Sequence, residues 1–181
     1  MKGTAATIRF TAIPYVLKGA LILRVPEDES VKLSSRGQIS VEGSINSHAF
    51  TAILEPDGYW SHWLRIDKRL RDAAAIQAGE ELDVELTQRS TWPEPTTPRD
   101  FAAALAAAPK KVHELWDAIT PMARWEWVRW INATNVTETR SRRVEASVSK
   151  MNSGKRRPCC FNLAACTDPD LSKGGRLIEQ E

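Results

Sequence analysis

Clustered basic side chains are the first feature of this sequence that could carry chemistry. Between residues 140 and 157 there are seven basic side chains and a single acidic one. Guanidinium groups bind phosphate and carboxylate through paired hydrogen bonds, so this stretch predicts contact with an anion. We expect a small anionic ligand or a protein partner to be held by four residues: Asn46, Arg140, Arg142 and Arg143.

Two other interpretations of the basic segment 140–157 stay open. It is also explained by a solvated helix face whose counter-charges come from the β-rich first half of the chain. Nucleic-acid binding is a further alternative, because phosphate contacts need such clusters. The net charge of +2 and the lack of aromatic side chains interleaved on the same face argue against nucleic acid.

The three cysteines, Cys159, Cys160 and Cys166, are the second chemical candidate. Thiolates bind soft metals, and basic neighbours favour the thiolate. Their spacing does not match the paired spacing of zinc knuckles, so a fourth ligand would come from His48, His62 or His113. A metal-binding or redox protein is therefore the alternative function. Otherwise the cysteines are buried or unreactive thiols on a docking tail.

An excess of tryptophan is the third feature. Four of the seven tryptophans, namely Trp116, Trp125, Trp127 and Trp130, lie within fifteen residues. They could form a stacking platform for a ligand. Three of them fall on helical stripes with aliphatic neighbours, which favours a packing role. Trp125 lies off its stripe, and we expect it to contact the first half of the chain.

Known catalytic patterns are missing from the sequence. There is no glycine-rich phosphate loop, no nucleophile elbow and no histidine pair at i and i+4. This favours a non-enzymatic protein, and the residues indicate no particular cofactor.

The first half of the chain must position these residues on strands. Period-two alternation predicts strands over 7–13, 20–25, 38–44, 49–54, 60–66 and 80–88. A hairpin turn is expected at residues 46–48, and short helices near 27–33 and 68–75. So many short strands in about 85 residues suit a closed or half-closed barrel, since closure removes exposed edges.

The second half changes to a helical period after a proline-rich stretch. Thr91–Pro98 contains three prolines and is typical of a stiff linker. Helices are expected over 99–108, 110–119, from Thr120-Pro121 onward, and over 137–150, which together make a small bundle. After Gly154 the periodicity is lost, so the tail is expected to be irregular.

The composition indicates in which compartment the protein resides and whether it inserts into a membrane. The 181 residues are 42% hydrophobic and 27% charged, which is ordinary for a soluble protein. No apolar run has the length of a membrane span, and the N-terminus lacks the pattern of a signal peptide. We expect a cytoplasmic protein with no membrane insertion. The oligomeric state cannot be predicted from these features.

Several of these residues resemble two bacterial families. Phe10, Val25-Pro26, the run Val41 to Asn46 with Phe50, Lys68, Arg71, Gly79-Glu80, Leu82 and Val84 resemble the family called domain of unknown function 1905 over residues 5–88. Trp130-Ile131, Glu138-Thr139-Arg140 and Arg142-Arg143, ending near Gly154, resemble the YdeI/OmpD-associated (bacteriocin-protection) family.

The resemblance implies a small β-barrel for the first part and an association with resistance to antimicrobial peptides for the second. The resemblance implies no catalytic residue in this sequence. The second family's name points to a periplasmic role, which no signal in this sequence supports. The sequence departs from the family patterns at Ser47, where relatives often have glycine, and at Thr134, where they often have lysine.

These observations together predict an α+β protein with a small β-barrel, a small helical bundle and an irregular tail that contains the cysteines. The expected divisions are a barrel over 1–90, a linker over 91–98, a bundle over 99–154 and a tail over 155–181. The predicted function is non-enzymatic binding or stress tolerance of the YdeI/OmpD-associated type, with an anionic ligand at the junction of barrel and bundle.

Overall fold

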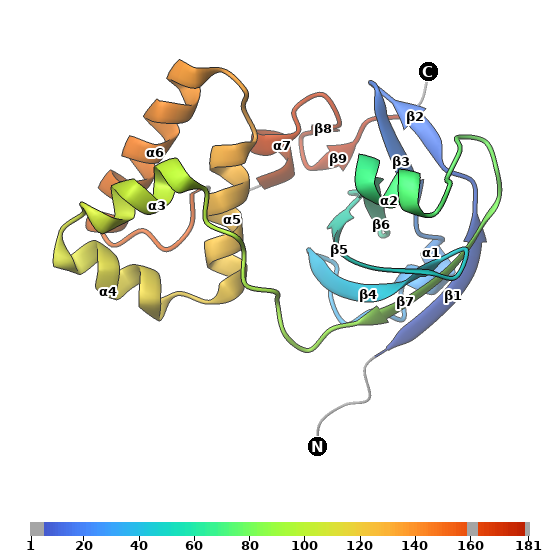
Figure 1. Cartoon of the computed structure of the whole chain (residues 1–181). Coiled ribbons are helices and arrows are strands. Elements are labelled where there is room, and N and C mark those ends of the chain that lie inside the picture. The colour runs from blue at the N-terminus through green and yellow to red at the C-terminus, as the bar shows by residue number, and fades with distance from the viewer. Residues whose placement is uncertain (1–5, 159–162, 180–181) are drawn as a thin grey trace. The chain divides into compact units, whose positions relative to one another are not determined.

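The chain forms two compact units (Figure 1). The computed structural model describes residues 6–158 and 163–179. The barrel unit contains the described residues up to Thr91 together with those from Asp170 onward, and the helical unit runs from Trp92 to Pro169. The fold is therefore α+β, with a β-rich part followed by helices, as the sequence predicts.

The main element of the barrel unit is an antiparallel sheet of seven strands. The strands are β1 (Thr7–Ala12), β2 (Tyr15–Leu17), β3 (Ala20–Arg24), β4 (Ile39–Ile45), β5 (His48–Pro56), β6 (His62–Ile66) and β7 (Leu82–Gln88). Their order across the sheet is β1-β7-β4-β5-β6-β3-β2. The sheet curls into a half-barrel, and β1 and β2 are its two outer strands. The sequence did not predict β2, which has only three residues.

The core of the barrel unit lies on the concave face of this sheet. Alternate residues point to opposite faces of a strand. Ile8, Leu23, Val41, Leu54 and Leu86 are all buried in one cluster, as the alternation in the sequence predicts. Two short helices, α1 (Glu27–Ser30) and α2 (Lys68–Ala73), follow β3 and β6. Asp67 caps α2 by accepting a hydrogen bond from the Leu70 amide at 2.8 Å.

The β4–β5 hairpin turns at Asn46 and Ser47, as predicted. Ile45 pairs with His48, so the loop has two residues, and both have positive φ, at 48° and 67°. Two such residues are typical of the turn whose twist matches that of the flanking strands. The Asn46 side chain accepts a hydrogen bond from the Asp83 amide at 3.1 Å, which ties the turn to β7.

The tail is more regular than the sequence predicts. It contains α7 (Leu163–Thr167) and a small hairpin of β8 (Ser172–Lys173) and β9 (Arg176–Leu177). The hairpin belongs to the barrel unit, where Leu171 and Leu177 pack against Ile22 and Trp63 on the outer face of the sheet. These contacts are distant in sequence, so local periodicity could not reveal them.

Gly58 allows this hairpin to approach the sheet. Its φ is 78°, and a Cβ atom there would lie 2.5 Å from the carbonyl oxygen of Gly175. The Leu177 amide donates to the carbonyl of Asp57 at 2.9 Å. A side chain at position 58 would separate the hairpin from the turn between β5 and β6.

The helical unit contains four longer helices besides α7. They are α3 (Arg99–Ala106), α4 (Lys110–Ala118), α5 (Pro121–Asn132) and α6 (Thr137–Asn152). Thr120 caps α5 by accepting a hydrogen bond from the Ala123 amide at 3.2 Å, and Pro121 occupies the first turn. Gly154, with a φ of 84°, follows the end of α6. Prolines and caps therefore set these boundaries as the sequence predicts.

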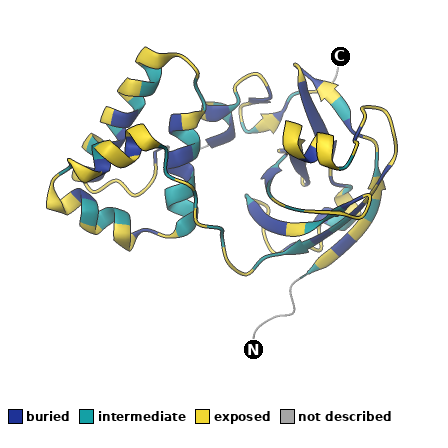
Figure 2. Ribbon diagram, viewed as in Figure 1, coloured by how far each residue is buried: buried dark blue, intermediate teal, exposed yellow. Residues whose placement is uncertain are grey.

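Tryptophan fills the core of the helical unit. Trp127 is completely buried, while Trp116 and Trp130 are partly buried against the same cluster, which also contains Phe101 and Met151. Figure 2 shows buried and exposed stretches alternating along the helices of this unit. The Phe101 and Trp116 rings meet edge to face, with centroids 5.4 Å apart. The packing interpretation of these tryptophans is confirmed.

Among the described residues, no helix combines the length and the apolar character that a membrane crossing requires.

Ser47 gives a test of the hairpin geometry. A non-glycine residue in the left-handed region is strained, so Ser47→Gly is expected to raise the free energy of unfolding by about 0.5 to 1 kcal/mol. Ser44→Gly, in the interior of β4, is the matched control and should lower it by a similar amount. Urea denaturation measures both. A loss of stability in Ser47→Gly would contradict the proposed turn strain.

Candidate functional site

Arg140 connects three parts of the helical unit. Its Nε and Nη2 atoms donate to the Asp100 carboxylate at 2.5 and 2.9 Å. Its Nη1 atom donates to the Asn132 side chain at 3.0 Å and to the Ile131 carbonyl at 3.3 Å. The ion pair raises the pKa of Arg140 and lowers that of Asp100. All three guanidinium nitrogens are thus used within the fold.

Arg143 lies one turn further along α6 and contacts the same end of α5. Its Nη1 atom donates to the Trp130 carbonyl at 2.6 Å, and its guanidinium lies 5.4 Å from the centre of the Trp130 ring. The last carbonyls of a helix have no partner within the helix and carry partial negative charge. Arg140 and Arg143 therefore cap the C-terminus of α5.

Arg142 and Asn46 are placed differently. Arg142 is exposed and pairs with Glu138 one turn earlier on α6, at 2.5 Å. Asn46 belongs to the barrel unit, where it forms the β4–β5 turn. The structure thus brings Arg140 and Arg143 together at one helix end and places Arg142 on the surface of α6. The predicted site that also includes Asn46 remains a prediction.

The rest of the basic segment contacts the helices around it. Lys150 donates to the Pro158 carbonyl at 3.0 Å, and Arg156 donates to the Ala118 carbonyl at 3.1 Å. Arg157 pairs with Glu126, which is buried. The Trp127 indole donates to the Arg156 carbonyl at 3.1 Å. These side chains therefore attach the chain after α6 to the bundle. The counter-charges expected from the β-rich half come instead from the helical unit, as Glu126 does for Arg157.

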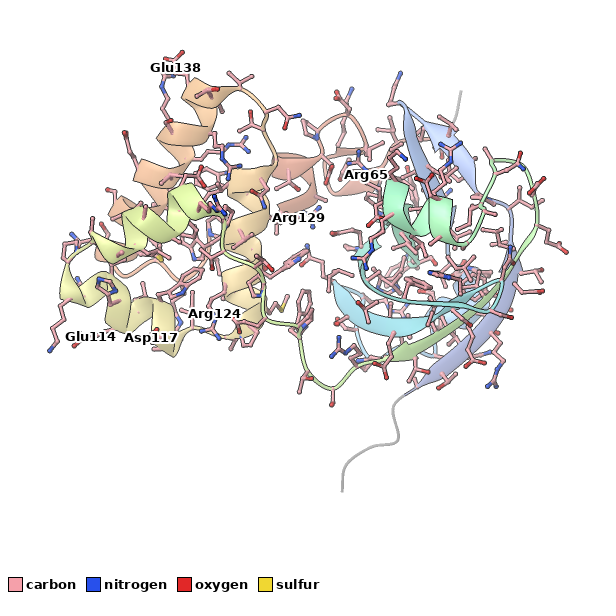
Figure 3. All side chains as sticks on the ribbon, viewed as in Figure 1. Arg65, Glu114, Asp117, Arg124, Arg129 and Glu138 are labelled. Atoms are coloured by element: carbon pink, nitrogen blue, oxygen red, sulfur yellow. The ribbon has the colours of Figure 1, made fainter. Side chains whose placement is uncertain are left out.

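The segment before α3 is also held by an arginine. Arg124, which projects from α5, donates to both carboxylate oxygens of Glu94, at 2.5 and 2.9 Å (Figure 3). Trp92 packs against Trp125, with ring centroids 5.1 Å apart. Trp125 was expected to contact the first half of the chain. In the structure it contacts this segment, which belongs to the helical unit.

The cysteine site is only partly within the described residues. Cys159 and Cys160 lie outside them, and Cys166 lies exposed on α7. The part of the chain that the structure describes holds no group of three metal-ligating side chains. Of the histidines, His113 contacts the Ala108 carbonyl at 3.1 Å and His48 is exposed in the β4–β5 hairpin. A metal or redox site at the cysteines remains a prediction.

His62 is buried within the barrel unit. Its Nε2 atom contacts the Gly37 carbonyl at 2.9 Å, and its Nδ1 atom contacts the Ser30 hydroxyl at 2.7 Å. A carbonyl only accepts, so Nε2 carries the proton and Nδ1 accepts from Ser30. Burial lowers the pKa of His62. The ring therefore has a structural role, with both nitrogens hydrogen-bonded inside the barrel unit.

A cavity in the barrel unit was not predicted from the sequence. It has a volume of about 650 Å³ and lies among β4, β5, β6 and α2. Arg65 and Arg69 line it together with Phe50 and Leu64. Arg65 lies on β6 (Figure 3). The sequence analysis did not single out these arginines, although residues 65–71 contain four basic side chains, those of Arg65, Lys68, Arg69 and Arg71.

The fold and these contacts define a class of protein: an α+β protein with a curled β half-barrel and a separate helical unit. Comparison with protein families agrees. Residues 5–86 match the model of domain of unknown function 1905, and residues 94–154 match the family described as bacteriocin-protection, YdeI or OmpD-associated. The chain therefore carries a domain of each family, in that order. No curated protein matches it.

Arg140 gives a test of the helix-end contacts. Arg140→Ala removes four hydrogen bonds and leaves Asp100 without its partner, so it should lower the free energy of unfolding by about 1 to 3 kcal/mol. Arg142→Ala removes an exposed pair one helix turn apart and should change it by less than about 0.5 kcal/mol. Chemical denaturation distinguishes the two. Equal effects would refute the capping role.

His62 makes stability depend on pH. Its folded pKa is lowered, so the unfolded state takes up the proton first, and stability falls as the pH drops below about 6.5. The slope should reach at most about 1.4 kcal/mol per pH unit. Unfolding free energies between pH 7.5 and 5.5 measure it. His62→Gln should reduce the slope, while His48→Gln, at an exposed position, should keep it. Equal slopes in all three proteins would be contrary evidence.

Proposed function

We propose that this chain is a non-enzymatic binding protein that contributes to bacteriocin protection or stress tolerance. The observation that carries the proposal is the match of residues 94–154 to the family described by that role. The family association comes with no reaction, and binding of an anionic ligand or partner is the function that the arginines of α6 support best.

The anionic group is assigned to Arg142 and Arg143. A guanidinium has five N–H donors. Within the described part of the chain, Arg143 donates one hydrogen bond, to the Trp130 carbonyl, so further donors remain for an anion. Arg142 is exposed, and its ion pair among the described residues is with Glu138 of the same helix, an interaction that costs little to exchange.

In this proposal Arg140 and Asn46 position other groups and do not themselves bind the anion. Arg140 holds α6 against the end of α5 and so positions Arg143 on the same helix. Asn46 holds the turn between β4 and β5.

Survival of bacteria tests the role. Cells that produce this protein should survive exposure to a peptide bacteriocin better than cells without it. The double variant Arg142→Ala/Arg143→Ala should lose this protection at equal protein level. Lys110→Ala/Lys111→Ala, which removes the same charge from α4, is the matched control and should keep it. Equal protection by both double variants would overturn the assignment to α6.

Binding to a polyanion tests the ligand class directly. Inorganic polyphosphate should raise the melting temperature of the natural protein and of the α4 control, and should not raise that of the α6 double variant. A single-stranded oligonucleotide bound with a steep salt dependence would instead support the nucleic-acid alternative. No shift with any polyanion would overturn the proposal of an anionic ligand.

A further inference from the structure

The cavity of the barrel unit lies where strand β5 diverges from its neighbour β6. β5 pairs with β4 from Ile39↔Leu54 to Ile45↔His48, but it pairs with β6 only at Glu55↔Trp63 and Pro56↔His62. Residues 48–54 of β5 therefore have no strand on the β6 side among the described residues. The cavity of about 650 Å³ lies along this open edge, with α2 on its other side.

The inner part of the cavity is apolar. Leu64 and Leu70 are buried members of the barrel core, and Phe50 and Ala52 pack against the same cluster. The polar part of the lining comes from Glu42, His48, Thr51, Arg65, Asp67 and Arg69, and Gly43, Ala49 and Ala73 complete it. The cavity thus combines an apolar floor with a charged rim, and its volume is within the range of about 300 to 1,000 Å³ that small ligands occupy.

The charged side chains of the rim differ in whether they already have a hydrogen-bond or ion-pair partner within the fold. The Asp67 carboxylate accepts the Leu70 amide at 2.8 Å, and Glu42 lies 3.8 Å from Arg89. Arg69 makes no hydrogen bond or ion pair within the described part of the chain, and Arg65 adds a second guanidinium to the rim. The carboxylates thus have partners within the fold, whereas Arg69 has its full donor set for an incoming anion.

We propose that this cavity binds an amphipathic organic anion, with its apolar body on Phe50, Ala52 and Leu64 and its carboxylate, phosphate or sulfonate on Arg69. The apolar floor supplies binding energy through burial, and the guanidinium selects for negative charge. This site lies within the barrel unit and uses none of the residues assigned to the proposed function. The cavity proposal and the proposed function can therefore be tested, and disproved, independently of one another.

A dye and its neutral analogue test the site. 8-Anilinonaphthalene-1-sulfonate has an aromatic body and one sulfonate, and its fluorescence rises in apolar surroundings. N-Phenyl-1-naphthylamine has the same body without the charge. The natural full-length protein should bind one equivalent of the charged dye, and decanoate should displace it if an aliphatic carboxylate is accepted. Displacement by benzoate alone would indicate an aromatic ligand.

Two variants connect the binding to this cavity. Arg69→Ala should weaken binding of the charged dye about tenfold and change binding of the neutral analogue less than about twofold. Arg71→Ala removes the same charge from α2 at a residue that does not line the cavity, and should bind both dyes normally. The comparison isolates the contribution of the Arg69 guanidinium.

A second pair of variants tests the volume. Ala73 is exposed on α2 and lines the cavity, so Ala73→Phe should fill the entrance and abolish binding of both dyes while the melting temperature stays nearly unchanged. Ala103→Phe, at an exposed position of α3, is the matched control, and this variant should bind both dyes normally. Unchanged dye binding in Ala73→Phe and Arg69→Ala would overturn the proposal.

Discussion

A buried carboxylate at one turn organises the barrel unit. Asp57 is 2% exposed, and its side chain accepts the amides of Tyr59 and Ser61 and an N–H of Arg24. A buried charge is stable only with such partners. The turn it holds joins β5 to β6, and its backbone carbonyl receives Leu177 of the C-terminal hairpin. Asp57 thus holds the turn that aligns β5 with β6, and it also binds the C-terminal hairpin that packs on the outer face of the sheet.

The geometry of that turn also explains the open edge. The turn aligns β5 and β6 for two residue pairs, Glu55↔Trp63 and Pro56↔His62. Beyond them β5 follows β4, whereas β6 follows β3 and leads into α2. A curled sheet that stays open leaves backbone groups and core side chains accessible at such a divergence. The cavity with Arg69 is therefore a consequence of how the half-barrel is built.

In the helical unit the corresponding constraint is the end of α5. The last carbonyls of a helix need donors, and α6 supplies Arg140 and Arg143 to Ile131 and Trp130. The same basic segment that indicates anion binding in the sequence thus satisfies the backbone of a neighbouring helix. Charge density alone could not separate these roles, because a guanidinium binds a carbonyl, a carboxylate and a phosphate by the same donors.

The sequence by itself determined most strands and helices, because alternation, caps and prolines act over a few residues: the Asn46-Ser47 turn and the start of α5 at Pro121 are examples. It also determined that Trp127 packs in a core. Only the tertiary structure decided which arginines are capping groups, that Leu177 returns to the outer face of β3 and β6, and that Arg69 borders a cavity. These depend on contacts between residues far apart in the chain, which local periodicity does not encode.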